Sequence, residues 1–295
     1  MHRVVPGLIV LLILSVLPLY AAAPQTVGLS ISTLNNPFFV DLRDGAQAAA
    51  KKANVNLVVL DGQNDSAREA SQIEDLIQKK VAVIAINPTD SDAIVPTIKK
   101  INAAKIPVIT VDRGANGGDV LAHIASDNVA GGRIAADYVG KRLNGKGSVV
   151  MLEGIAGTSA ARDRGKGFRE GLKKYPGITL VAVQTADFDR AKGLTVMENI
   201  LQAQKKIDAV FAQNDEMALG AIQAIEAAKR QKGMFVVGFD AIADALAAVK
   251  AGKMAATIAQ QPKEMGRLAV EAAVKIINKQ SVPKFTPVPL KLVTK

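Results

Sequence analysis

The sequence predicts an α/β protein of two similar lobes, each built on a doubly wound parallel sheet. With 295 residues, the chain is longer than one hydrophobic core usually serves. Short runs rich in valine, isoleucine and leucine alternate with longer segments of helical periodicity, and repeated βα units of this kind form parallel sheets. The alternation continues to about residue 126 and then starts again, which favours two lobes over a single eight-unit barrel.

Ten segments have the composition of buried strands. Most are separated by segments whose apolar residues recur at intervals of three and four, such as Phe39, Leu42 and Ala46. Because no stretch rich in proline and glycine separates the halves, we expect short hinge segments between the lobes. The predicted strands are Val27–Ser32, Leu57–Asp61, Val81–Asn87, Val108–Asp112, Val120–Ala125, Ser148–Glu153, Leu180–Gln184, Ala209–Ala212, Phe235–Phe239 and Ala255–Ala259.

Residues 1–23 have the layout of a secretory signal peptide. His2 and Arg3 precede the uncharged run Val4–Leu19, and three alanines follow at positions 21–23. An uncleaved membrane anchor is the alternative, since the uncharged run approaches the length that spans a bilayer. The small residues at its end favour removal, and no later stretch is apolar enough to span a membrane. We therefore expect an exported protein.

Composition argues against several classes of function. The chain has no cysteine, so it has no disulfide framework and no cysteine for lipid attachment, which favours a freely diffusing periplasmic protein. The net charge of +10 comes from basic residues scattered beside acidic ones, so we expect a solvated surface and no nucleic-acid partner. His123, the one histidine after the signal, is interpreted as a packed strand residue. We predict no catalytic residue, metal or cofactor.

Polar side chains follow many of the predicted strands. Ligands of open α/β sheets bind at the carboxyl ends of the strands, so these side chains are expected to face a common cleft. Carboxylates, amides and guanidinium groups can bond vicinal hydroxyls in pairs, as a sugar requires, and Phe38, Phe39 and Phe188 offer flat faces for its C–H groups. The polar residues at the strand ends are Asn35, Asn36, Asn87, Asp112, Arg113, Asn214, Asp215 and Asp240.

Each of these residues also has a purely structural interpretation. Asn36 before a proline would cap a helix in any protein. Asp112 and Arg113 could form a structural ion pair, and Phe38 and Phe39 could both belong to the core. Recurrence at five strand ends, in both halves of the chain, favours a shared binding cleft over capping alone.

Several long and specific strings are distributed over the chain. They are STLNNPFF at 32–39, NPTDSD at 87–92, HIASDN at 123–128, GIAGTSAAR at 154–162, ADFDR at 186–190, FAQNDEMALG at 211–220 and ATIAQ at 256–260. These strings resemble the sugar-binding members of the type 1 periplasmic binding protein family, and the similarity covers essentially all of the chain after the signal.

The resemblance implies two lobes joined by three crossings, with the sugar bound between them. The crossings are expected near Ser126-Asp127, Gln260 and Val288-Pro289. The signal peptide would be residues 1–23, the N-terminal lobe 24–126 plus 261–288, and the C-terminal lobe 127–260 plus 289–295.

The resemblance also implies ten residues that contact the sugar. Phe38 and Phe188 are expected on opposite faces of the ring, and Asn87 and Ser126 are expected to support the site without direct contact. The ten residues are Asn36, Phe38, Phe39, Asp112, Arg113, Arg164, Phe188, Asn214, Asp240 and Gln260.

The implied function is that of the solute-binding component of an ABC importer. It would bind a monosaccharide, D-ribose first, by hinge closure and deliver it to a membrane permease. A monomer in the periplasm is expected, with a chemotaxis receptor as an optional further partner. The alternatives are allose, galactose or xylose as ligand, a sugar-sensing regulator, or a sugar-processing enzyme. A regulator would need an N-terminal helix-turn-helix domain, but the signal-peptide pattern occupies that position. An enzyme would need a catalytic carboxylate pair, but Asp112 and Asp240 are interpreted as residues that bind sugar hydroxyls.

Overall fold

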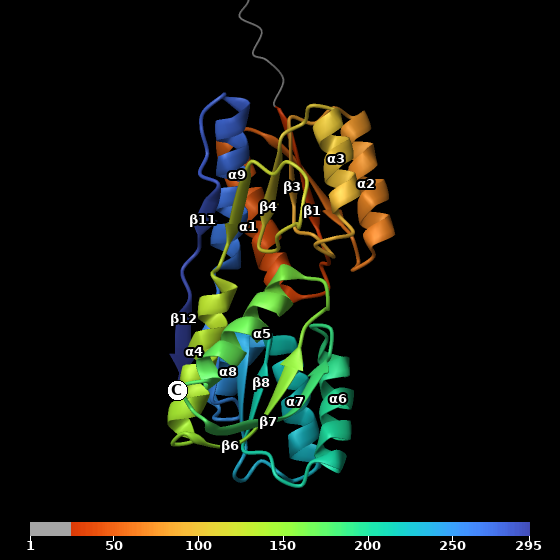
Figure 1. Cartoon of the computed structure of the whole chain (residues 1–295). Coiled ribbons are helices and arrows are strands. Elements are labelled where there is room, and N and C mark those ends of the chain that lie inside the picture. The colour runs from red at the N-terminus through yellow and green to blue at the C-terminus, as the bar shows by residue number, and fades with distance from the viewer. Residues whose placement is uncertain (1–24) are drawn as a thin grey trace, which may run out of the picture.

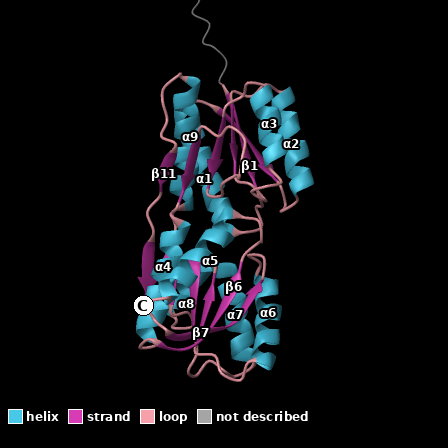
Figure 2. Ribbon diagram, in the orientation of Figure 1, coloured by secondary structure: helices cyan, strands magenta, loops and turns pink. Residues whose placement is uncertain are grey.

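A computed structural model of the chain describes residues 25–295, so the predicted signal peptide lies outside the described residues. Two α/β lobes lie end to end along the long axis of the molecule (Figures 1 and 2). Each lobe contains one six-stranded sheet with helices on both faces, as the sequence predicts. The buried apolar residues lie between each sheet and its helices.

The N-terminal sheet has the strand order β11-β5-β4-β3-β1-β2, and all of its pairings are parallel. Helix α1 packs on α9, and helices α2 and α3 lie together on the other side of the sheet (Figure 1). The strands are β1 (Thr26–Ile31), β2 (Asn56–Asp61), β3 (Val83–Ile86), β4 (Val108–Val111), β5 (Ala122–Ala125) and β11 (Phe285–Pro287), and the helices are α1 (Pro37–Ala53), α2 (Ser66–Gln78), α3 (Val95–Ala103) and α9 (Pro262–Ile277).

The C-terminal sheet has the order β12-β10-β9-β8-β6-β7. Helix α4 packs on α5, and α6 packs on α7 on the opposite side of the sheet (Figure 1). The strands are β6 (Lys146–Glu153), β7 (Gly177–Thr185), β8 (Ala209–Ala212), β9 (Phe235–Asp240), β10 (Ala256–Ala259) and β12 (Lys291–Thr294), and the helices are α4 (Asn128–Arg142), α5 (Ser159–Leu172), α6 (Arg190–Ala203), α7 (Asp215–Ala227) and α8 (Ala243–Lys250).

The chain passes between the two sheets three times. It crosses after β5, after β10, and between β11 and β12, where the Val288 N–H donates to the Ala125 carbonyl at 2.9 Å. Two sheets joined by three segments hold the lobes in register while leaving rotation about the crossings possible.

Each of the ten predicted strands has a counterpart in the two sheets, but β11 and β12 were not predicted. They have three and four residues, lie at sheet edges and are partly exposed, so they lack the long apolar run by which a buried strand is recognised. Strand β12 pairs antiparallel with β10, which is the one departure from parallel pairing in the described sheets.

The interpretation of His123 as a packed strand residue is confirmed. It lies half-buried in β5, with Nδ1 2.9 Å from Thr110 Oγ1 and its ring stacked on Phe285 at a centroid distance of 5.8 Å. Within residues 25–295, no helix has both the length and the hydrophobicity needed to cross a membrane.

Close helix packing at glycine joins the main helix pairs. A Cβ atom at Gly266 of α9 would lie 2.0 Å from the Leu42 carbonyl oxygen, and one at Gly45 of α1 would lie 2.0 Å from the Lys263 carbonyl oxygen. Glycine therefore lets these backbones touch where any side chain would separate the helices. The same arrangement recurs between α4 and α5 at Gly132 and Gly167, and between α6 and α7 at Gly193 and Gly220.

Replacing Gly266 by alanine should therefore lower the midpoint of thermal unfolding. Overpacking of this kind destabilises by about 1–3 kcal/mol, which exceeds the gain in helix propensity of up to about 1 kcal/mol. Gly114→Ala is the control, because its Cβ would meet no atom closer than 3.7 Å. Equal midpoints for the wild type and Gly266→Ala would show that α1 and α9 can separate freely.

Candidate ligand-binding site

All ten residues expected at the sugar line one small cavity between the lobes. They come from the carboxyl ends of strands or the helix turns that follow, as the sheet topology requires. Ala160, in the first turn of α5, completes the lining and was not predicted, because a small apolar helix residue carries no signal of a binding role. The N-terminal lobe supplies Asn36, Phe38, Phe39, Asp112 and Arg113, and the rest of the chain supplies Ala160, Arg164, Phe188, Asn214, Asp240 and Gln260.

Four charged side chains are buried in this cavity. Asp112, Arg113, Arg164 and Asp240 are each at most 6% exposed. The closest opposite charges are Arg164 Nη1 and Asp240 Oδ1, which are 3.6 Å apart. The described side chains of Asp112 and Arg113 form no direct ion pair with each other, so the structural pairing considered from the sequence is wrong. Two carboxylates and two guanidinium groups give the cavity a balanced formal charge.

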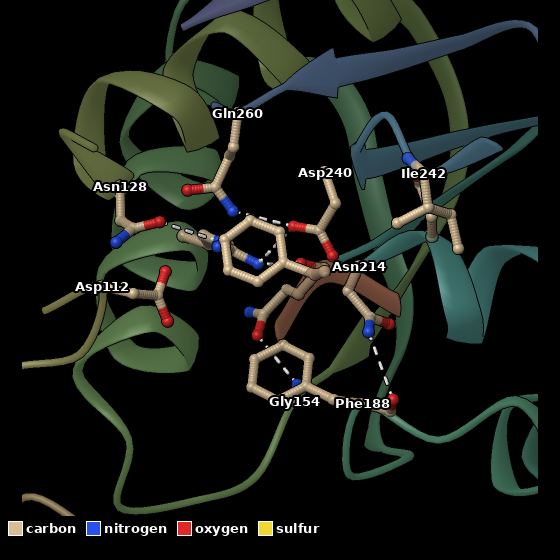
Figure 3. Close-up of polar contacts among 12 residues, drawn as sticks. Asp112, Asn128, Gly154, Phe188, Asn214, Asp240, Ile242 and Gln260 are labelled. Atoms are coloured by element: carbon tan, nitrogen blue, oxygen red, sulfur yellow. Dashed lines mark hydrogen bonds and ion pairs between the residues drawn. The ribbon is translucent and has the colours of Figure 1, made fainter. Parts of the chain in front are cut away.

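Arg164 is held by neutral partners on the C-terminal lobe. Its Nε donates to Asn128 Oδ1 at 2.8 Å, and its Nη1 donates to the Gln213 carbonyl at 2.7 Å (Figure 3). The guanidinium also lies 3.9 Å from the centroid of the Phe239 ring. These contacts fix the guanidinium plane before any ligand arrives.

Asn87 performs the corresponding role on the N-terminal lobe. Its Nδ2 donates to Asp112 Oδ2 at 3.0 Å and to the Val111 carbonyl at 3.1 Å. Its Oδ1 accepts from the Ser32 backbone N–H and hydroxyl at 3.2 and 2.7 Å. One buried amide thus ties the ends of β1, β3 and β4 together and orients the Asp112 carboxylate, which agrees with the supporting role expected for Asn87.

Two fully buried acceptor oxygens of the cavity residues have no hydrogen-bond partner among the described residues. Asn87 bonds only one oxygen of Asp112, and Oδ1 has no partner. Gln260 Nε2 donates to Asp240 Oδ1 at 2.8 Å, and this leaves Gln260 Oε1 without a partner (Figure 3). The Oγ of Ser126 at the first crossing is also buried and unpaired within residues 25–295, but Ser126 does not line the cavity. Buried acceptors are costly unless a donor reaches them.

Three cavity residues have backbone conformations that non-glycine residues rarely adopt. The φ angles of Asp112, Phe188 and Asp240 are 61°, 58° and 120°. Buried Asp215 supports the turn after Asp240, since its carboxylate accepts the Ile242 N–H at 3.0 Å and the Thr257 hydroxyl at 2.7 Å. Strain of this kind persists only where surrounding contacts fix it, and it concentrates at functional sites.

Burial dominates the electrostatics of the cavity. It raises the pKa of Asp240 to about 7, against the lowering effect of Arg164. It also raises the pKa of Asp112 and lowers that of Arg113 to about 10. Each charge is therefore held in an environment that favours its neutral form, so further hydrogen bonds to the charged forms would be stabilising.

The aromatic and amide residues have the structural roles considered from the sequence, and they also line the cavity. Asn36 caps α1, since its Oδ1 accepts the Phe38 N–H at 2.9 Å, and it also lines the cavity. Phe38 and Phe39 belong to the buried core and pack edge to face at 5.2 Å while facing the cavity. Asn214 caps α7 and donates from Nδ2 to the Phe188 carbonyl at 3.2 Å (Figure 3).

The cavity combines buried charged groups with acceptor oxygens that have no partner among the described residues. Within the part of the chain that the structure describes, no group of three or more histidine, cysteine or acidic side chains is arranged to hold a metal ion. The buried charged groups are fixed by hydrogen bonds and present acceptors and donors to the cavity from both lobes.

Comparisons with known proteins agree with this geometry. Residues 27–281 match the model of the periplasmic binding protein domain family. The ribose import binding protein RbsB of Salmonella typhimurium is 54% identical over 275 residues, covering 93% of this chain and 92% of that protein. The D-allose-binding periplasmic protein of Escherichia coli is 34% identical and covers 93% of each chain. The structure of a Caulobacter myo-inositol binding protein with myo-inositol superposes with a TM-score of 0.88 at 35% identity, over 93% of this chain and 96% of that one.

Glu69 is a buried glutamate outside the cavity lining. Glu69 of α2 is 1% exposed, and its carboxylate oxygens accept the Thr89 N–H at 3.2 and 3.3 Å. Burial raises its pKa from 4.5 to about 7, against the lowering effect of the Thr89 N–H. Because the folded state binds this proton more tightly than the unfolded state, the stabilisation from Glu69 is present at low pH and is lost as the pH rises from 4.5 to about 7.

Glu69→Gln should remove this dependence. The difference in free energy of unfolding between Glu69→Gln and the wild type should grow in favour of the variant across that pH window, reaching roughly 3 kcal/mol above it. Urea denaturation at several pH values measures this difference. A constant difference from pH 4 to pH 8 would mean that Glu69 titrates normally in the fold.

Proposed function

The chain belongs to the periplasmic binding protein domain family, and from this membership and its cavity we propose that it binds D-ribose between its lobes. It would then be the solute-binding component of an ABC importer, acting in the periplasm after removal of its signal peptide. The relative at 54% identity is a ribose import binding protein, and the relative at 34% identity is a D-allose-binding periplasmic protein.

The observation that carries the proposal is the set of fixed but incompletely paired polar groups in the cavity. Asp112 Oδ1 and Gln260 Oε1 are buried acceptors, and a sugar hydroxyl could donate to each. The guanidinium groups of Arg113 and Arg164 would donate to sugar oxygens. Because the four buried charges balance formally, the cavity favours a neutral polyol over an ion.

The apolar lining supports a pyranose or furanose ring. Phe38, Phe39 and Phe188 offer ring faces from both lobes, and we propose Phe38 and Phe188 for the opposite faces of the sugar.

Binding would close the lobes about the three crossings. We take the N-terminal lobe as residues 24–126 plus 261–288 and the C-terminal lobe as 127–260 plus 289–295, because β11 and α9 join the first sheet and β12 joins the second. Sugar would stabilise the closed form because only there does it touch both lobes. A membrane permease would then recognise the surface of the closed monomer around the cleft. A chemotaxis receptor could be a second partner that recognises the same closed form.

Ribose is favoured over the alternatives by similarity. Identity is 54% to a ribose import binding protein but 34% to a D-allose-binding protein. The related structures nevertheless include complexes with D-allose and myo-inositol, so the same frame accommodates several polyols.

Isothermal titration of the mature protein should show one-to-one binding of D-ribose. Allose, galactose and xylose, titrated under the same conditions, should bind at least about tenfold more weakly, since an extra or misplaced hydroxyl leaves buried partners unpaired. If one of these sugars gave a heat of binding and D-ribose gave none, lobe closure would remain the proposed mechanism and that sugar would replace D-ribose as the ligand.

Arg113→Ala should weaken D-ribose binding by about 1.5–3 kcal/mol, because the sugar oxygens would lose a charged hydrogen-bond donor. Circular dichroism should show an intact fold. Arg43→Ala, which removes an exposed arginine paired with Asp44, is the matched control and should bind as the wild type does. If Arg113→Ala bound D-ribose with wild-type affinity, Arg113 would not contribute to sugar binding.

A further inference from the structure

The two lobes touch directly at Gly157, in the loop between β6 and α5. Its carbonyl oxygen accepts the Ser91 N–H of the other lobe at 3.1 Å. Gly157 has φ +90°, and a Cβ atom there would lie 2.0 Å from Asp90 Oδ2. The Asp90 carboxylate is itself held, because Oδ1 accepts the N–H groups of Asp92 and Ala93 at 2.8 Å each. Only a glycine therefore allows the lobes to approach this closely.

A second contact lies beside the first. The Gly114 N–H donates to Ser159 Oγ at 2.8 Å, and Arg162 Nη2 donates to Asn116 Oδ1 at 3.2 Å. Ser159 and Arg162 belong to α5, which lies at the boundary between the lobes (Figure 1). We call these two sets of hydrogen bonds the rim contacts.

None of the residues in the rim contacts lines the cavity. Their hydrogen bonds join the β3–α3 and β4–β5 connections of one lobe to the start of α5 in the other, so they exist only when the lobes are closed. They stabilise the closed form without touching a ligand.

We propose that the rim contacts act as a latch, and that Gly157 is the residue on which the latch depends. This inference rests on the proposed function, in which closure captures the sugar. The observed dissociation constant is the intrinsic one divided by the fraction of molecules in the closed, binding-competent form. A weaker latch lowers that fraction and so lowers the affinity, although every sugar-binding side chain is retained. Gly157, Asp90 and Ser159 are thus positioning residues for capture.

The test compares two glycine-to-alanine variants at positions with nearly equal positive φ angles. Gly157→Ala places a methyl group against Asp90, whereas Gly233→Ala, at φ +91° with no atom within 4 Å of its Cβ, introduces the same left-handed alanine without a contact. D-ribose affinity, measured by titration calorimetry, should fall about tenfold or more in Gly157→Ala and stay unchanged in Gly233→Ala. Both should show similar losses in thermal midpoint.

The Asp90→Ala background separates lobe contact from local strain. Removing the Asp90 carboxylate should make room for the methyl group, so Gly157→Ala should lose much less affinity in this background than in the wild type. Equal losses in both backgrounds, or a Gly157→Ala variant that binds as tightly as Gly233→Ala, would overturn the latch. A wild type that does not bind D-ribose would instead overturn the proposed function.

Discussion

Two arginine and two aspartate side chains are buried between the lobes of this protein, and most other features of the site follow from the need to keep them there. Burial disfavours each charge, as the shifted pKa values of Asp240 and Arg113 show. Buried amides and carbonyls compensate: Asn87 holds Asp112, while Asn128 and the Gln213 carbonyl hold Arg164. These partners are distributed over both lobes, so the charged cluster is completed only when the lobes meet.

The same constraint links folding to binding. The supports fix the positions of the charged groups but leave Asp112 Oδ1 and Gln260 Oε1 unpaired among the described residues. Strained backbone at Asp112, Phe188 and Asp240 points the side chains into the cavity and is maintained by the surrounding contacts. A neutral polyol could complete the hydrogen bonding without upsetting the charge balance. The rim contacts are separate from this hydrogen-bond network, and their proposed role is only to stabilise the closed form.

Much of this could be predicted from the sequence, for identifiable reasons. The alternation of apolar runs and helical periods predicts the two sheets, and polar residues at strand ends predict a shared cleft because parallel strands end at one edge. The short edge strands β11 and β12 carry too few apolar residues to be recognised. Ala160 and Gly157 have no polar side chain, so only the three-dimensional arrangement reveals their positions. Likewise, the capping role of Asn36 and its place in the cavity are both real, and sequence alone could not choose between them.

A crystal structure of the mature protein grown with D-ribose would test the central claim most directly. We expect one sugar enclosed between the lobes, with hydroxyls donating to Asp112 Oδ1 and Gln260 Oε1 and with aromatic rings from both lobes against its faces. A sugar bound to one lobe only, or a closed cavity in which these two oxygens still lack partners, would contradict it.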